Sequence, residues 1–196
     1  WGFSLSNFIK KIYLNDYHQD NNAKFISFSN YSMPINYKLG VINENLHTRN
    51  HAGIFDVSHM GQILIKNLNS NISFLEKYIP LSLRKLNNNK SYYSFLLNCQ
   101  GGIIDDIIIS RITYNSNQYF FIVYNSSRIE EDEKIFKEIL LDYIFLKDNS
   151  LLAIQGPLAK KIINFLPNVN NLLHMNSIVI NYYDYLIIVS RSGYTG

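Results

Sequence analysis

Residues 92–113 read YYSFLLNCQGGIIDDIIISRIT. Two apolar, β-branched runs, at Tyr92–Asn98 and Ile103–Thr113, are separated by a short segment that ends in two glycines. Runs of this composition are typical of strands, and glycine has the backbone freedom that a tight turn between strands needs. The segment therefore predicts a β-hairpin.

Two adjacent aspartates interrupt the second of these apolar runs. Because successive side chains of a strand point to opposite faces, Asp105 shares one face with Ile107, and Asp106 shares the other with Ile108. One face of such a strand is usually buried, and a buried carboxylate is costly unless it is paired or used. Spacing alone leaves two interpretations open: a functional site, or an edge strand or hairpin base where both acids reach solvent.

Further strands and helices are expected on both sides of the hairpin. The apolar patterns predict strands at Met60–Lys66, Tyr119–Tyr124 and Leu151–Gln155, and a second hairpin from Ile178–Ile180 and Tyr185–Ser190. Helices are expected at Gly40–Ala52 (ended by Gly53), at Asn69–Tyr78 and between Pro157 and Pro167. This mixture favours an α+β fold with mixed, largely antiparallel sheets and packed helices.

The clearest helix is expected to begin at Ser127. Ser127 and Glu130 have the spacing of a capping box, in which a hydroxyl and a carboxylate bond free N–H groups of the first turn. The apolar stripe that follows consists of Ile135, Ile139, Tyr143 and Leu146. The pattern therefore predicts one helix that runs past Tyr143.

The composition excludes several classes of protein. The chain has 196 residues, of which 47% are apolar and 17% charged, so it is too apolar for a disordered protein. Its unbroken apolar runs are too short to span a bilayer, and a net charge of +3 gives no reason to expect nucleic acid or a membrane as a partner. A single cysteine, Cys99, excludes an internal disulfide framework and a cysteine-rich metal site.

Two histidine-containing patterns receive structural interpretations. Asp56-Val57-Ser58-His59 holds an acid, a hydroxyl and an imidazole, but hydrolytic triads are normally assembled from separate segments, so we expect a polar turn. His47 and His51 lie four residues apart on an expected helix, and zinc would need a third protein ligand. We therefore expect solvated histidines and no metal site.

Several short motifs resemble, in order and spacing, the T protein family of the glycine cleavage system, the aminomethyltransferases. The resemblance runs from about Leu14 to the end of the sequence, and Leu46–Arg49 is most similar to mitochondrial members. The motifs that carry it are Met33-Pro34 ahead of Tyr37, His47-Thr48-Arg49, GIFDVSHM from Gly53 to Met60, Tyr93-Ser94, Asn98, GGIIDD from Gly101 to Asp106, Asn125, Gln155-Gly156-Pro157 and GYTG from Gly193 to Gly196.

This resemblance implies the folate-binding aminomethyltransferase fold, a location in the mitochondrial matrix and tetrahydrofolate as co-substrate, with no metal. Such a protein takes the aminomethyl group from the lipoyl arm of its partner, the H protein, and passes the methylene to tetrahydrofolate with release of ammonia. By resemblance, Asp106 is catalytic and meets nitrogens on the pterin side, and Asp105 is structural. The positions that match the folate cavity are Met60, Tyr93, Ile108 and Asn125, with Tyr194 expected to close over it.

Two relatives of the same fold are the alternatives. One is a non-catalytic folate-binding protein of iron–sulfur cluster assembly, whose diagnostic reactive cysteine would lie further along than this sequence. The other is the folate domain of a dimethylglycine or sarcosine dehydrogenase, which usually replaces the first acid of the pair. The presence of Asp105 and of the Asp-Val-Ser-His-Met motif favours the transferase.

The two ends of the sequence carry expectations of their own. Residues 1–15 contain Lys10 and Lys11 and no acid, which leaves two interpretations open: a remnant of a targeting segment, or a disordered terminus. Residues 16–196 are expected to be the N-terminal folate-binding portion. Asn30-Tyr31 replaces a usual Gly-Trp, and the sequence stops before the acidic segment that follows GYTG in the family. We therefore expect the isolated 196 residues to have an incomplete folate site and no activity.

Overall fold

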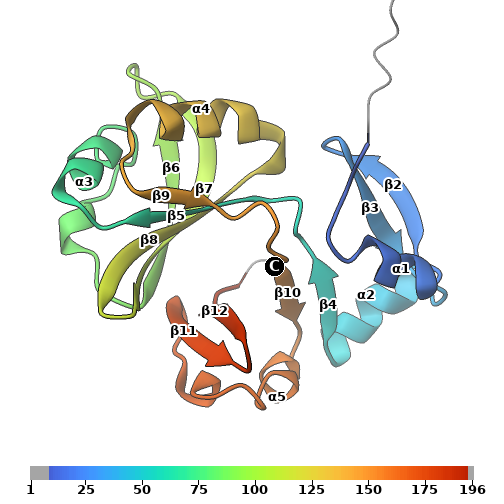
Figure 1. The fold of residues 1–196 in the computed structure, drawn as a ribbon. Helices are drawn as coiled ribbons and strands as arrows, with labels where there is room; N and C mark the ends of the chain where they lie inside the picture. The colour runs from blue at the N-terminus through green and yellow to red at the C-terminus, as the bar shows by residue number, and fades with distance from the viewer. Residues whose placement is uncertain (1–8, 194–196) are drawn as a thin grey trace, which may run out of the picture. The chain divides into compact units, whose positions relative to one another are not determined.

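The computed structural model describes residues 9–193, which divide into two units (Figure 1). The first unit consists of the chain up to His59 together with Asp148–Ala159, and the second of Met60–Lys147 together with the chain from Lys160 onward. Strands and helices are mixed along the chain, so the expected α+β class is confirmed. No helix within residues 9–193 is long and apolar enough to cross a membrane.

The first unit contains two small sheets and two helices. In the larger sheet β3 (Tyr31–Asn36) lies between β1 (Lys10–Lys11) and β2 (Lys24–Phe28), and in the smaller one β4 (Gly53–Asp56) is antiparallel to β10 (Leu152–Gln155). The helices are α1 (Asn15–Asp20) and α2 (Val41–Asn50). The pairing of β4 with β10 joins segments that are far apart in the sequence.

The second unit is built on an antiparallel sheet of seven strands, in the order β12, β11, β6, β7, β8, β5, β9. Their bounds are β5 (Gly61–Lys66), β6 (Lys90–Leu97), β7 (Ile103–Tyr114), β8 (Asn117–Tyr124), β9 (Tyr143–Phe145), β11 (Asn176–Tyr182) and β12 (Tyr185–Arg191). The helices are α3 (Asn69–Leu75) and α4 (Ile129–Ile139). The short helix α5 (Ala159–Ile162) contains the point in the sequence where the first unit ends and the second resumes. Short 3-10 helices form at η1 (Leu83–Lys85), η2 (Ser126–Arg128) and η3 (Val169–Asn171).

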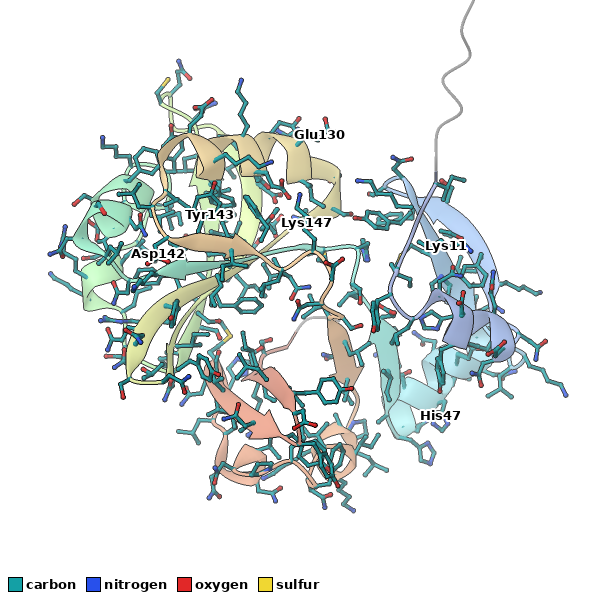
Figure 2. The ribbon with its side chains drawn as sticks, in the orientation of Figure 1. Lys11, His47, Glu130, Asp142, Tyr143 and Lys147 are labelled. Carbon is teal, nitrogen blue, oxygen red and sulfur yellow. The ribbon has the colours of Figure 1, made fainter. Side chains whose placement is uncertain are left out.

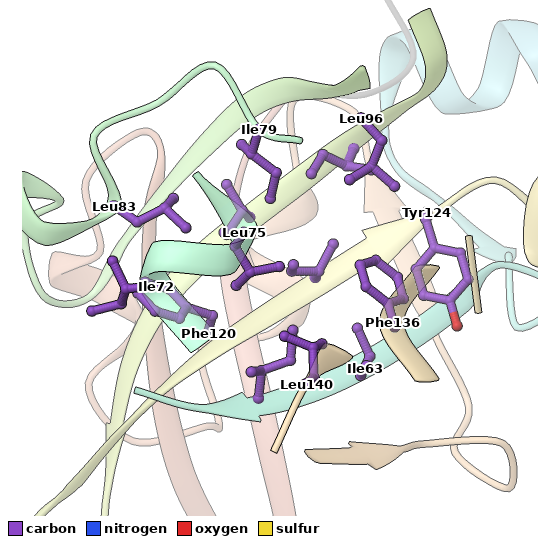
Figure 3. Close-up of a cluster of buried hydrophobic side chains, with 14 of the residues drawn as sticks. Ile63, Ile72, Leu75, Ile79, Leu83, Leu96, Phe120, Tyr124, Phe136 and Leu140 are labelled. Atoms are coloured by element: carbon purple, nitrogen blue, oxygen red, sulfur yellow. The ribbon is translucent and has the colours of Figure 1, made fainter. Parts of the chain in front are cut away.

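The main hydrophobic core of the second unit lies between the sheet and the helices α3 and α4 (Figure 3). Alternate residues of β5, β7 and β8, such as Ile63, Ile107 and Phe120, are at most 1% exposed. Phe136 of α4 packs edge-on against Tyr124 of β8, with ring centroids 5.5 Å apart. Because this core buries one face of β7, it determines which of the two aspartates is removed from water.

The hairpin at residues 92–113 is confirmed as β6 and β7. In its turn, the side-chain oxygen of Asn98 accepts hydrogen bonds from the backbone N–H groups of Gln100 and Gly102, at 3.0 and 2.8 Å. Gly101 has a positive φ of 80°, a conformation that glycine adopts without strain. The other predicted strands and the second hairpin are also present, as β5, β8, β10 and β11–β12.

The prediction of one long helix from Ser127 is wrong at both ends. The chain forms the 3-10 turn η2 first, and α4 begins at Ile129 without a side-chain cap, so the capping box does not form. α4 ends at Ile139, and Tyr143 lies in β9, which pairs with β5. Asp142, with a φ of 58°, turns the chain between the two elements. Pairing with the sheet thus overrides the helical periodicity.

Two other helix predictions need a correction in length. α2 is confirmed, but Gly53 does not cap it; this glycine begins β4, where a Cβ would collide with a side chain of α2. The helix expected from Asn69 ends at Leu75, and the one expected between Pro157 and Pro167 is reduced to the four residues of α5.

Candidate functional site

The two aspartates of β7 point to opposite faces, as strand geometry predicts. Asp105 is 5% exposed and lies on the core face, whereas Asp106 is exposed on the other face. β7 has a neighbour on each side, β6 and β8, so it is not an edge strand. The interpretation in which both acids reach solvent is therefore wrong.

Asn125, the residue that follows β8, joins the two carboxylates. Its backbone N–H donates to Oδ2 of Asp105 and its Nδ2 donates to Oδ1, each at 2.8 Å. The same Nδ2 lies 2.8 Å from Oδ1 of Asp106. Asp105 thus has an N–H donor on each oxygen, which compensates the burial of its charge. Asp106 is held in a defined orientation by the same amide.

Asp106 has a second partner on the exposed face of the sheet. The hydroxyl of Tyr93 donates a hydrogen bond to Oδ2 of Asp106 at 3.2 Å. Tyr93 is 58% exposed and lies opposite Ile108 in the β6–β7 ladder, so all three side chains share one face. A carboxylate beside an aromatic ring and an aliphatic side chain can bind a flat molecule that carries N–H groups.

Met60 lies beside Asn125 at the ends of two paired strands. The β5–β8 ladder ends at Gly61 opposite Tyr124, so the next residues, Met60 and Asn125, lie next to each other beyond that end. A Cβ at position 61 would collide with the ring of Tyr124, and glycine therefore permits this close pairing. Tyr194 lies outside the described residues, and its role stays a prediction.

Beside Asp105 lies a further acid, which the sequence patterns did not single out. Asp132 of α4 is 0% exposed, and its oxygens accept no hydrogen bond from an N–H or O–H group within residues 9–193. Its carboxyl group instead shares a hydrogen bond with Asp105, and burial, followed by the effect of Asp105, raises the pKa of Asp132 to about 8. Because acidic side chains are rarely buried, no sequence pattern singled out Asp132.

The first unit contains a buried polar network around Asp56. Its Oδ2 lies 3.0 Å from Nε2 of His18, whose Nδ1 lies 2.6 Å from the hydroxyl of Tyr37. The other oxygen of Asp56 accepts the N–H of Ser58 at 2.9 Å, which confirms the predicted polar turn. The side chains of His18 and Asp56 are 6% and 1% exposed, so this network joins α1, β4 and the residue that follows β3 in a buried setting. Sequence spacing could not reveal it, because its members lie far apart along the chain.

The other histidines of the first unit are His47, His51 and His59. The ring of His59 packs edge-on against Phe28 and Tyr31, and burial lowers the pKa of His59 despite the opposing effect of Asp56. The rings of His47 in α2 and of His51, which follows α2, are stacked with centroids 4.8 Å apart, and both residues are exposed, which confirms that they are solvated. In the part of the chain that the structure describes, no three His, Cys, Asp or Glu side chains are grouped to hold a metal ion.

A family model, the GCVT N-terminal domain, matches residues 14–196. The chain belongs to this family. The mitochondrial aminomethyltransferase of Dictyostelium discoideum is 35% identical to it over 208 residues, which cover 99% of this chain and 50% of that protein. The aminomethyltransferase of Caldanaerobacter subterraneus subsp. tengcongensis is 36% identical over 210 residues, covering 98% of this chain and 52% of that protein.

Structural similarity leads to the same family. The crystal structure of glycine cleavage system aminomethyltransferase T from Bartonella henselae matches with a TM-score of 0.82 and 37% identity, over 95% of this chain and 51% of that one. The GCVT chain described here therefore spans about half the length of the relatives it matches. The resemblance read from the motifs and the fold class that it implied are both confirmed. The matched relatives include one mitochondrial protein and several from bacteria, and the location of this protein stays a prediction.

Proposed function

We propose that this chain is the N-terminal, folate-binding portion of an aminomethyltransferase of the glycine cleavage system. Its relatives carry that name, and the observation that supports the proposal most strongly is the exposed carboxylate of Asp106, held by Asn125 and Tyr93. The reaction would move the methylene of an aminomethyl group, carried as a thioaminal on the lipoyl arm of the H protein, to tetrahydrofolate. Ammonia and the dihydrolipoyl H protein are the other products.

Tetrahydrofolate fits the chemistry of the face around Asp106. The substrate offers a flat pterin ring and several N–H groups, and this face offers an exposed tyrosine ring, the side chain of Ile108 and a carboxylate that can accept from N–H. Met60 and Asn125 would border the same ligand at the ends of β5 and β8. We therefore assign Met60, Tyr93, Ile108 and Asn125 to folate binding.

Asp106 would act by position and charge. A fixed carboxylate beside the folate nitrogens orients the nucleophile toward the methylene carbon. Its negative charge stabilises the iminium that develops on that carbon as the C–S bond of the thioaminal breaks and the thiolate of the lipoyl arm leaves. Because one N–H donor, from Asn125, and one O–H donor, from Tyr93, already hold the carboxylate, little reorganisation is needed when the substrate binds. Asp105, which lies in the core, would support this arrangement without touching the substrate.

Replacement of Asp106 tests the proposal. In the full-length protein, Asp106→Asn should lower the rate of methylene transfer from the aminomethyl H protein to tetrahydrofolate by roughly 100-fold or more, because the carboxylate charge that stabilises the iminium is lost. The matched control is Asp142→Asn, which changes an exposed acid paired with Lys66 at the surface (Figure 2). The control should transfer at the wild-type rate.

Two outcomes would contradict this function. Wild-type turnover in Asp106→Asn would remove Asp106 from the mechanism. Tight binding of tetrahydrofolate without any transfer in the wild-type full-length protein would instead support a non-catalytic folate-binding protein. The name of the Dictyostelium relative supports a mitochondrial location, and the proposed matrix location is tested by fluorescence of the tagged full-length protein in its own cells.

A further inference from the structure

Asp132 occupies surroundings that do not suit a charged carboxylate. Its side chain is 0% exposed, and neither of its oxygens accepts a hydrogen bond from an N–H or O–H donor within residues 9–193. A carboxylate there would lose its hydration without replacement, whereas a neutral carboxyl group needs only one acceptor for its proton. Asp105 is the neighbouring acceptor, since after burial its hydrogen bond is the largest cause that raises the pKa of Asp132.

The shared proton belongs on Asp132 and not on Asp105. Both oxygens of Asp105 already accept N–H groups from Asn125, at 2.8 Å each, and such donors favour a charged acceptor. Asp132 has no comparable donor. The proton of the pair is therefore assigned to Asp132, which donates it to a carboxyl oxygen of Asp105.

The other charges near Asp132 do not change this assignment. Arg128 donates from Nε to the carbonyl of Ile104 at 3.1 Å, and its Nη1 lies 3.4 Å from Oε1 of Glu131, so its charge is already shared. Burial and Asp105 raise the pKa of Asp132 to about 8, with a smaller contribution from Glu131, and Arg128 opposes them. Asp132 thus remains neutral at neutral pH.

We infer that Asp132 is a positioning residue for the site at Asp106. The proton of Asp132 holds Asp105, Asp105 anchors the backbone N–H and the amide of Asn125, and that amide donates to Asp106. The inference rests on the proposed function, since the orientation of Asp106 toward the folate is what these contacts would maintain. No part of it requires Asp132 to touch the substrate.

Loss of the proton from Asp132 should disturb the whole arrangement. Two buried carboxylates at hydrogen-bond distance repel each other, and Asp105 would then move away from Asn125. The transfer rate of the wild-type protein should therefore fall as the pH rises through about 8. Asp132→Asn replaces the proton by an amide N–H, which can donate to Asp105 at every pH.

The test compares transfer rates of the full-length protein from about pH 6 to about pH 9.5 in the wild type, Asp132→Asn, Asp132→Leu and Glu130→Gln. Asp132→Asn should transfer within about twofold of the wild type at pH 7 and should lack the alkaline loss. Asp132→Leu has no donor and should be slower by roughly 10- to 100-fold at every pH. Glu130→Gln, which changes an exposed acid of the same helical turn (Figure 2), should keep the wild-type profile.

A second measurement does not depend on catalysis. Carboxyl ¹³C NMR of the wild-type full-length protein should show an aspartate that titrates near pH 8 and is missing from Asp132→Asn. An alkaline loss that persists in Asp132→Asn, wild-type rates in Asp132→Leu, or no aspartate titrating above about pH 6 would each overturn the inference. If Asp106→Asn kept full activity, the proposed function would fail, while the titration of Asp132 would still be decided by NMR.

Discussion

Asn125 shows how few side chains define the candidate site. It supplies N–H donors to both oxygens of the buried Asp105 and to one oxygen of the exposed Asp106. An exposed carboxylate normally samples several rotamers, and fixing one of them has an entropic cost that must be met when the ligand binds or beforehand. Here the protein meets that cost beforehand, because Asn125 and Tyr93 hold Asp106 from two sides.

The raised pKa of Asp132 also makes the free energy of unfolding depend on pH. Its pKa is raised from 3.8 to about 8 on folding, so its stabilising contribution is complete below the unfolded pKa and is lost as the pH rises toward about 8. Asp132→Asn does not titrate. In urea unfolding of the full-length protein, the stability of Asp132→Asn relative to the wild type should therefore rise between about pH 5 and about pH 8. A pH-independent difference would contradict the raised pKa.

The network around Asp56 gives a prediction for the first unit. Asp56→Asn should lower the free energy of unfolding by roughly 2–4 kcal/mol, because an amide cannot accept from both His18 and Ser58 as the carboxylate does. Asp20→Asn, at the exposed end of α1, is the matched control and should change it by less than about 0.5 kcal/mol. Chemical denaturation measures both, and equal effects would show that the buried network contributes nothing.

At the scale of elements, the sequence predicted strands better than helix ends. The hairpin of β6 and β7 and the opposite faces of Asp105 and Asp106 follow from a period of two, which every strand must obey. The helix predicted from Ser127 is longer than the one that forms, because Tyr143 continues the helical periodicity by chance. Tyr143 instead pairs within the sheet. Sequence periodicity records which side chains are apolar, but it does not record which distant strand will compete for them.

The turn after β10 depends on one glycine. Gly156 has a φ of 116°, and a Cβ there would come within 2.6 Å of the carbonyl oxygen of His51 and 2.9 Å of Cα of Ala52. Gly156→Ala should therefore lower the free energy of unfolding by roughly 3 kcal/mol or more, because the added side chain would strain the backbone and collide with backbone atoms. Gly101→Ala also places a side chain at positive φ, but with no atom within 4 Å, and should cost only about 1–2 kcal/mol. Similar losses in thermal unfolding would contradict the close approach.

At the scale of the whole molecule, the residues of the site divide into those that a motif can reveal and those that it cannot. Asp106, Tyr93 and Asn125 lie in short motifs whose order resembles the family, and the chain does belong to that family. Asp132 and His18 required the fold, because their importance comes from burial and from partners that lie far away in the sequence. The chain spans about half the length of the relatives it matches.

A crystal structure of the full-length protein with tetrahydrofolate would test the proposed site most directly. We predict that the pterin lies against the face of β6 and β7 that carries Tyr93 and Ile108, with a folate nitrogen within hydrogen-bond distance of the Asp106 carboxylate. Asn125 should still donate to Asp106 in that complex. A pterin bound elsewhere, with Asp106 facing only solvent, would contradict the assignment of the site.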